Sequence, residues 1–359
     1  MKLLALCTSG YSHQLDHLVP LCFYLNTPLI LTDPQMYSLS QKYYPFTDVQ
    51  YLPEKECSLE FLAKNADLLV LSSKHWAKEL SNYFKHLYQK NMRFCYAPHG
   101  NSDKGSLRPS EDLLFGQDLS FIYGNHMKEM LEKRGVLSSL QGVIVTGNYR
   151  YDFYKKHKFF FDALAKQEVF SLFKNNHPIL LYAPTWQDPE KSTSFFQSLS
   201  PMLDSLPDHF NLLIKLHPNL QRDDPALVYH LIGKYEEKKN VVFLCDYPLV
   251  YPLLSQVRAY VGDFSSVGYD FLCFNKPLFF INHQKRDPKK DAGLALFACG
   301  KILDPSHPNF FKTIENELSA SIDTLQQIRL QTYQYTFDSL VDFSSLKNQL
   351  IETALKTSY

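Results

Sequence analysis

The stretch Val261-Gly-Asp-Phe-Ser-Ser-Val-Gly-Tyr-Asp-Phe-Leu272 runs from an apolar strand, through a turn with two hydroxyl groups, into a helical pattern. A strand that leads directly into a helix is the repeating unit of parallel α/β sheets. The first amides of a helix lack acceptors within the helix and lie at the positive end of its dipole. Ser265 and Ser266 could therefore add hydroxyl donors to an anion site. Ordinary N-capping by serine is the alternative.

Short apolar runs alternate with longer amphipathic segments along the whole chain, which predicts parallel sheets with crossover helices. The expected strands of the first half are residues 2–7, 28–31, 67–71, 92–97, 119–123 and 142–146, with helices at 75–89 and 128–134. Those of the second half are residues 179–183, 210–216, 241–244, 259–261 and 277–281, with helices from 311 onward. The predicted fold class is α/β, with two doubly wound Rossmann-like domains facing a cleft and ligands at the carboxyl ends of the strands.

The length of 359 residues also favours two domains. We expect a first domain over residues 1–155, a helical connector rich in Lys and Phe over 156–176, and a second domain over 177–335. A final helix over 336–359 could cross back to the first domain.

Composition and charge limit the kinds of binding partner and the cellular compartment that we expect. Lys+Arg and Asp+Glu balance at 37 each, so no overall field draws the protein to nucleic acid. The basic runs at 155–158 and 285–290 could contact anionic lipid or polymer, or simply be solvated. Seven cysteines without a C-x-x-C pair fit reduced thiols in a cytoplasm. Since no apolar stretch approaches about 18 residues, any membrane contact is expected to be peripheral.

A histidine next to a glycine follows the strand at 92–97, in Pro98-His99-Gly100-Asn-Ser-Asp-Lys104. His99 can accept a proton from a hydroxyl near neutral pH, and Gly100 permits close approach of another group. The pair suits a general base. A turn histidine that caps a helix is the alternative.

Two further strand ends carry polar side chains. In Tyr182-Ala-Pro-Thr-Trp-Gln-Asp188, Thr185 offers a hydroxyl to a phosphate and Trp186 could stack on a base or line a pocket. In Lys215-Leu-His-Pro218, His217 could donate to a phosphate oxygen or protonate a leaving group, whereas Lys215 is expected to point into solvent. A plain strand end and a structural histidine are the alternatives.

Two carboxylates accompany the serines of the opening stretch. Asp263 precedes them, and Asp270 could reach ribose hydroxyls, although the helix dipole alone favours an acid there. No Walker loop, G-x-G-x-x-G or H-E-x-x-H string appears, which argues against the usual NTPase, dinucleotide and zincin interpretations. No metal-ligand spacing is evident, so no metal site is predicted.

Taken together, the segments 182–188, 215–218 and 262–271 resemble the signature of the CDP-glycerol glycerophosphotransferase family, whose members polymerise teichoic acids. His99-Gly100 with Lys104 is similar to that family's His-Gly segment. Thr146-Gly-Asn-Tyr-Arg150-Tyr-Asp152 is similar to its Gly-x-Pro-Arg-x-Asp segment. The resemblance extends over residues 90 to 285.

This resemblance implies a glycosyltransferase-B type fold with an acceptor-side first domain and a second domain that binds a CDP-linked polyol donor, without cofactor or essential metal. It implies that His99 deprotonates the acceptor hydroxyl, which attacks the donor's distal phosphorus and expels CMP. The resemblance also implies that the pyrophosphate is held by Thr185, His217, Ser265 and Ser266, and that His217 is catalytic as well. It implies contacts with the nucleotide, or support of the interdomain site, by Trp186, Asp263, Asp270, Arg150, Asp152, Gly100 and Lys104.

The chain departs from the family pattern in three places. Asn101-Ser-Asp replaces the usual Thr-Pro-Leu before Lys104, and Tyr149 replaces a proline. Residues 282–288 replace a run that contains Tyr and Asp and leads to Arg-Gly. These departures leave the acceptor and the polyol open.

The leading hypothesis is a CDP-glycerol or related CDP-polyol phosphotransferase. It would act from the cytoplasm on a surface polymer or a lipid-linked precursor, and any contact with the inner face of the membrane is expected to be peripheral. A nucleotide-sugar glycosyltransferase or epimerase on the same scaffold is a second hypothesis, because fold does not fix function. A degenerate, non-catalytic nucleotide-binding protein is a third.

Overall fold

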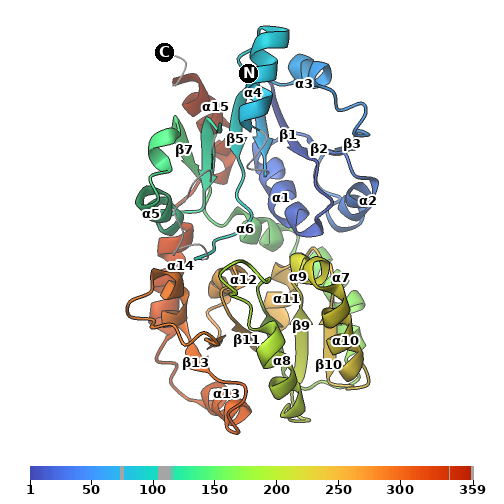
Figure 1. Ribbon diagram of the computed structural model, residues 1–359, viewed down its shortest axis with the longest axis vertical. Coiled ribbons are helices and arrows are strands. Elements are labelled where there is room, and N and C mark those ends of the chain that lie inside the picture. The colour runs from blue at the N-terminus through green and yellow to red at the C-terminus, as the bar shows by residue number, and fades with distance from the viewer. Residues whose placement is uncertain (73–76, 104–113, 115, 339, 357–359) are drawn as a thin grey trace. The chain divides into compact units, whose positions relative to one another are not determined.

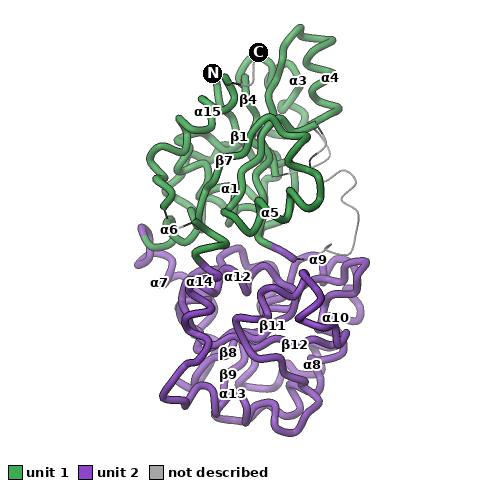
Figure 2. Tube along the Cα trace, turned by 90° about the vertical axis from the view of Figure 1, so that its left-hand side faces the viewer, with its two compact units in different colours: residues 1–101, 109–155, 334–359 green, residues 102–108, 156–333 purple. Residues whose placement is uncertain are grey.

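The computed structural model describes residues 1–72, 77–103, 114, 116–338 and 340–356. The chain forms two compact units (Figure 2). Unit 1 comprises Met1–Asn101, Pro109–Lys155 and Gln334–Tyr359, and unit 2 comprises Ser102–Arg108 and Lys156–Tyr333. Residues 156–176, expected as a connector, cluster with unit 2, and the C-terminal residues cluster with unit 1.

Unit 1 is built on a parallel sheet that has seven strands within the described residues, in the order β3-β2-β1-β4-β5-β6-β7 (Figure 1). The strands are β1 Leu3–Cys7, β2 Leu29–Leu31, β3 Val49–Tyr51, β4 Leu68–Leu71, β5 Arg93–Tyr96, β6 Leu119–Ile122 and β7 Gly142–Val145. The helices are α1 Leu15–Leu25, α2 Pro34–Tyr43, α3 Leu59–Asn65, α4 Ala77–Tyr88, α5 Asn125–Lys133, α6 Tyr149–Lys156 and α15 Leu346–Lys356, with 3₁₀ turns η1 Ser12–Gln14, η2 Leu137–Ser139 and η6 Phe343–Ser345.

Unit 2 is built on a second parallel sheet, which has six strands in the part of the chain that is described, in the order β10-β9-β8-β11-β12-β13. The strands are β8 Ile179–Ala183, β9 Asn211–Lys215, β10 Val241–Leu244, β11 Ala259–Gly262, β12 Leu278–Ile281 and β13 Lys301–Leu303. The helices are α7 Lys158–Glu168, α8 Phe195–Asp204, α9 Pro218–Asp223, α10 Pro225–Tyr235, α11 Tyr251–Gln256, α12 Val267–Phe271 and α13 Phe310–Ser319, with 3₁₀ turns η3 Phe170–Leu172, η4 Leu272–Phe274 and η5 Ala292–Cys299. Helix α14, Gln326–Phe337, begins in unit 2 and ends in unit 1.

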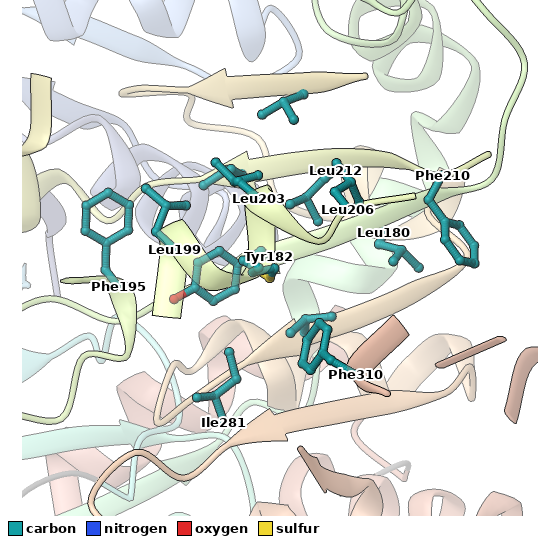
Figure 3. Packing of buried hydrophobic residues seen from close by; sticks show 14 of the residues in the cluster. Leu180, Tyr182, Phe195, Leu199, Leu203, Leu206, Phe210, Leu212, Ile281 and Phe310 are labelled. Carbon is teal, nitrogen blue, oxygen red and sulfur yellow. The ribbon is translucent and has the colours of Figure 1, made fainter. Parts of the chain in front are cut away.

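The central strands of both sheets read as apolar runs because helices cover both faces of a parallel sheet. In unit 2, side chains of β8 and β9 such as Leu180 and Leu212 pack with Leu199 of α8 and Phe310 of α13 in one buried cluster (Figure 3). Tyr182 lies in the same cluster, and its hydroxyl oxygen is 2.8 Å from Oγ of Ser194. The core of unit 2 therefore reaches up to the loop that follows β8.

The predicted fold class, α/β with two doubly wound parallel sheets, is confirmed. Two strands, β3 and β13, were not expected. Both have three residues and lie at sheet edges, where most of their side chains are at least partly exposed. An edge strand of this kind lacks the continuous apolar run by which a buried strand is recognised.

A pair of glycine substitutions tests the packing of β13 against β12. A Cβ atom at Gly300 would lie 2.3 Å from the carbonyl oxygen of Leu278, so backbone must move. Gly300→Ala should lower the free energy of unfolding by about 1–3 kcal/mol, the usual cost of overpacking. The matched control is Gly233→Ala, on an open face of α10. It should gain about 0.5–1 kcal/mol of helix propensity.

Urea unfolding curves of both variants measure the two changes. Equal free energies of unfolding for Gly300→Ala and the wild type would show that β13 can shift to make room for the methyl group without loss of stability.

Candidate active site

The candidate residues of unit 2 gather at one edge of its sheet. Strands β9, β8, β11 and β12 are consecutive neighbours, and all run parallel. The segments that follow their carboxyl ends carry His217, Thr185, Ser265 and the loop 282–291 in turn. The strand order reverses direction between β8 and β11, and ligands bind at such a switch point in open α/β sheets.

Asp263 fixes the geometry of this edge. Its side chain is fully buried, with 0% exposure. One carboxylate oxygen accepts the N–H of Thr185 at 2.8 Å, and the other accepts the N–H and the hydroxyl of Ser194, each at 2.7 Å. The end of β11 is thereby tied to both ends of the loop that follows β8. Asp263 thus anchors the loop that carries Thr185 and Trp186.

His217 presents a ring N–H. Its Nδ1 accepts the backbone N–H of Asn219 at 3.1 Å, so the neutral imidazole carries its proton on Nε2. The residue caps α9, and Pro218 at the first helical position fixes the turn. The half-buried ring of Trp186 lies 6.3 Å from the imidazole. This geometry suits donation from Nε2 to an anionic oxygen.

Lys215 does not point into solvent as predicted. The side chain is buried, with 8% exposure. It ends β9, a strand flanked by β8 and β10, so even an outward position is covered. Burial raises the pKa of the nearby Cys245 thiol, and the ammonium of Lys215 partly offsets that shift. The cation therefore lies within the sheet edge, where its charge is weakly screened.

The two serines differ in their surroundings. The hydroxyl of Ser265 is 3.4 Å from the N–H of Val267, a long contact, and Ser266 is the N-cap of α12 without a side-chain cap bond. Helix α12 has only five residues. Ordinary side-chain capping by Ser266 is therefore not observed.

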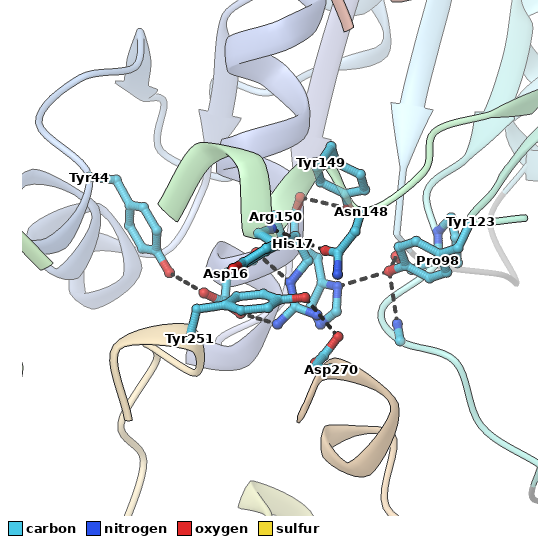
Figure 4. Close-up of polar contacts among 12 residues, drawn as sticks. Asp16, His17, Tyr44, Pro98, Tyr123, Asn148, Tyr149, Arg150, Tyr251 and Asp270 are labelled. Carbon is cyan, nitrogen blue, oxygen red and sulfur yellow. Dashed lines mark hydrogen bonds and ion pairs between the residues drawn. The ribbon is translucent and has the colours of Figure 1, made fainter. Parts of the chain in front are cut away.

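Helix α12 is held by two phenols. Asp270 is buried, and its Oδ1 accepts the hydroxyl of Tyr251 at 3.0 Å (Figure 4). The hydroxyl of Tyr269 donates to Asp103 at 2.6 Å, and residues 102–108 belong to unit 2. One oxygen of Asp270 is thus engaged by a hydrogen bond within unit 2.

In unit 1, the exposed ring of His99 follows β5 on a loop held by Tyr123. The Tyr123 hydroxyl donates to the carbonyl of Pro98 at 2.9 Å and accepts the N–H of Gly100 at 3.1 Å (Figure 4). Gly100 has a φ of 122°, a backbone conformation that favours glycine. Lys104 lies outside the described residues.

The third contact of this hydroxyl determines the tautomer of His17. Nδ1 of His17 is 3.0 Å from Oη of Tyr123. Since the phenol proton is used on Pro98, Nδ1 must be the donor, and the neutral ring is protonated there. Burial, followed by the positive charge of Arg150, lowers the pKa of His17 well below its ordinary value. The hydrogen-bond network that holds the loop of His99 therefore contains the neutral imidazole of His17.

Arg150 and Asp152 hold α6 against α1. The buried guanidinium of Arg150 donates from Nε to the carbonyl of Asp16 at 3.0 Å and pairs with the Asp16 carboxylate (Figure 4). Asp152 accepts the hydroxyl of Tyr24 at 2.5 Å. Both residues, which the family resemblance assigned to the nucleotide or to the support of the interdomain site, make these bonds within unit 1.

The sequence analysis did not single out several residues of these networks, among them His17, Tyr123 and Ser194. Tyr123 ends the predicted strand 119–123, and this position was the one available signal. Neither Ser194 nor His17 belongs to a recognisable motif. Their hydrogen-bond partners, Asp263 and Tyr123, lie far along the chain and are not evident from the sequence.

The comparisons with known proteins place the chain in a family. A family model described as CDP-Glycerol:Poly(glycerophosphate) glycerophosphotransferase matches residues 117–296, half of the chain. The protein belongs to this family of transferases. The matched range includes Thr185, His217 and the two serines but not His99. Among curated protein sequences, none matches at a significant level.

Solved structures with the same fold extend over the whole chain. Wall teichoic acid polymerase TagF aligns with a TM-score of 0.62 and 15% identity, over 99% of this chain and 88% of that one. UDP-GlcNAc 2-epimerase from Neisseria meningitidis, bound to UDP-GlcNAc, aligns with a TM-score of 0.59 and 14% identity, over 99% and 100%. Anabaena HepE, in complex with UDP and glucose, gives 0.55 and 14%, over 99% and 100%. At these identities the likeness establishes the fold, which is of the glycosyltransferase-B type.

No helix in the described part of the chain is both long and apolar enough to cross a bilayer.

The buried imidazole of His17 predicts a dependence of stability on pH. An unfolded histidine titrates near pH 6.5, whereas the folded ring stays neutral to lower pH. The unfolded state therefore binds the extra proton, and stability is lost as pH falls below 6.5. The free energy of unfolding should therefore be lower at pH 5.5 than at pH 7.5. Urea unfolding at both pH values should show this loss in the wild type but not in His17→Asn; parallel curves would contradict it.

Asp263→Asn tests the anchor of unit 2. An amide replaces one accepting oxygen by a donor that faces N–H groups, so the variant should lose about 2–4 kcal/mol of unfolding free energy. Asp208→Asn is the control, because that carboxylate is exposed. Chemical denaturation of the two variants measures the difference, and an equally small effect in both would remove the anchoring role.

Proposed function

We propose that the protein is a CDP-glycerol or related CDP-polyol glycerophosphotransferase that transfers the phosphopolyol to a hydroxyl of a surface polymer or lipid-linked acceptor. The observation that carries this proposal is the gathering of Thr185, His217 and Ser265 at adjacent strand ends, ordered by Asp263, in a chain of this family. A TagF structure obtained after soaking with CDPG supports a CDP-linked donor.

The proposed chemistry is a single displacement at phosphorus. The acceptor hydroxyl passes its proton to His99 while its oxygen attacks the distal phosphorus of the donor. The bond from this phosphorus to the bridging oxygen breaks, and CMP leaves with the electron pair. Nε2–H of His217 donates to an oxygen of the departing phosphate, and Thr185 with the two serines holds the rest of the pyrophosphate.

Fixed donors take the place of a metal ion in this proposal. Hydroxyl groups, a ring N–H and the charge of the buried Lys215 lie at the same sheet edge. Preorganised donors of this kind stabilise the charge that develops in the transition state. We further propose that the enzyme works in the cytoplasm and meets its acceptor through a peripheral contact with the membrane.

A nucleotide-sugar epimerase or glycosyltransferase is the second candidate. It is favoured by the solved structures with UDP or UDP-GlcNAc, whose TM-scores are close to that of TagF. Titration with CDP-glycerol, CMP, UDP and UDP-GlcNAc separates the two, because the preferred nucleotide defines the donor.

His99→Ala tests the transfer reaction itself. With CDP-glycerol and a poly(glycerophosphate) acceptor, the wild type should release CMP, and the variant should lose about 10²–10⁴-fold in kcat as a general base is removed. The KM for the donor should change little, because the donor is assigned to unit 2. A coupled assay for CMP gives both constants.

The control is His86→Ala, which removes an exposed histidine of α4. Turnover should persist in EDTA. Tighter binding of UDP compounds, abolition of turnover by EDTA, or an unchanged kcat in His99→Ala would each count against the mechanism, and nucleotide binding without any turnover would indicate a binding protein.

A further inference from the structure

Glu190 is a buried carboxylate without a hydrogen-bond donor. It lies in the loop 184–194 that follows β8, and its side chain is only 10% exposed. Neither oxygen has a hydrogen-bonding partner. Nη1 of Arg286 is 4.0 Å from Oε2, which is an ion pair but too long for a hydrogen bond.

Several contacts hold Arg286 in this position. Its Nε donates to the carboxylate of Asp291, and its backbone N–H and carbonyl are both bonded to the side chain of Asn282, at 3.0 and 2.7 Å. The guanidinium lies over the ring of Phe264, 4.6 Å from the centroid. Its Nη2 is buried and also lacks a partner.

The backbone at Glu190 is fixed as well. Nε2 of Gln284 donates to the carbonyls of Glu190 and Lys191, at 2.5 and 2.9 Å. Nε2 of His283 lies 2.9 Å from the carbonyl of Lys191. Asp263 holds the far end of the same loop through Ser194. The ion-paired side chains of Glu190 and Arg286, whose carboxylate oxygens and Nη2 lack hydrogen-bond partners, therefore lie on two anchored loops.

This pair lies next to the candidate phosphate site. Strand β11 is between β8 and β12 in the sheet, so the loops with Glu190 and Arg286 flank the turn after β11. Phe264, which contacts Arg286, directly precedes Ser265. The pair thus lies on the two loops that flank the turn carrying the serines.

The chemistry of the pair selects hydroxyl groups. A buried carboxylate without donors is costly, and so is an unpaired guanidinium N–H. A hydroxyl both donates and accepts, so one alcohol can donate to Glu190 while it accepts from Nη2 of Arg286. A second anion is disfavoured, because Glu190 and Asp291 already place two negative charges around one cation.

We propose that Glu190 and Arg286 form a subsite for the hydroxyl groups of the polyol on the distal phosphate of the donor. The subsite rests on the proposed function. Arg286 and Asn282, which holds its backbone, belong to residues 282–288, where the chain departs from the family pattern, so the subsite would set this protein's own polyol preference.

Titration calorimetry with CDP-glycerol and with CDP isolates the contribution of the polyol. Glu190→Gln should weaken binding of CDP-glycerol about tenfold, the size of one lost hydrogen bond to a charged group, and leave CDP within twofold. The control Glu237→Gln removes an exposed carboxylate of unit 2 and should change neither. Glu190→Asp keeps the charge beside Arg286 while withdrawing the oxygens, and should show a smaller selective loss; it decides the matter if Glu190→Gln does not fold.

Equal losses for both ligands, or no loss, would overturn the subsite. So would a lower melting temperature in Glu190→Gln without a change in the difference between the ligands, because that result identifies a structural ion pair. If the wild type prefers UDP-GlcNAc, the proposed function fails but the subsite is tested by UDP-GlcNAc against UDP. If it binds none of these compounds, both proposals fail.

Discussion

The geometry of the candidate site in unit 2 depends on the hydrogen bonds that the carboxylate of Asp263 accepts. A buried negative charge is tolerated only when donors surround it, and here one carboxylate takes three, from two residues of the loop that follows β8. The loop is thus ordered by a strand that is its neighbour in the sheet but lies about 80 residues further along the chain. The hydrogen bond from Thr185 to Asp263 ties the segment of Thr185 to the segment of Ser265, so the distance between these two segments is fixed.

In unit 1, a neutral side chain rather than a carboxylate holds the loop that carries a candidate residue. The hydroxyl of Tyr123 takes part in three hydrogen bonds and holds the loop of His99 without introducing a charge. The pKa of His17, whose Nδ1 contacts the same hydroxyl, lies well below its ordinary value because of burial and the positive charge of Arg150, so its ring is neutral.

The sequence allowed prediction of whatever depends on local pattern. Each expected strand matched an apolar run, and the segments with Thr185, His217 and Ser265 follow strands, so sheet topology alone brings them to one edge. Lys215 was placed wrongly, because local pattern does not reveal that β9 is covered on both faces. The Glu190 and Arg286 pair could not be predicted, since it joins two loops separated by β11 and depends on the positions of individual side-chain atoms.

The assignment of residues 102–108 to unit 2 has a consequence for dissecting the protein. The chain passes between the units at 101/102, 108/109, 155/156 and 333/334, so neither unit is one continuous segment. Asp103 accepts the hydroxyl of the buried Tyr269 in α12. A fragment cut at 156 and 333 would keep every strand of the second sheet yet leave that phenol without its acceptor. The boundaries of the second sheet are therefore not those of a self-sufficient module.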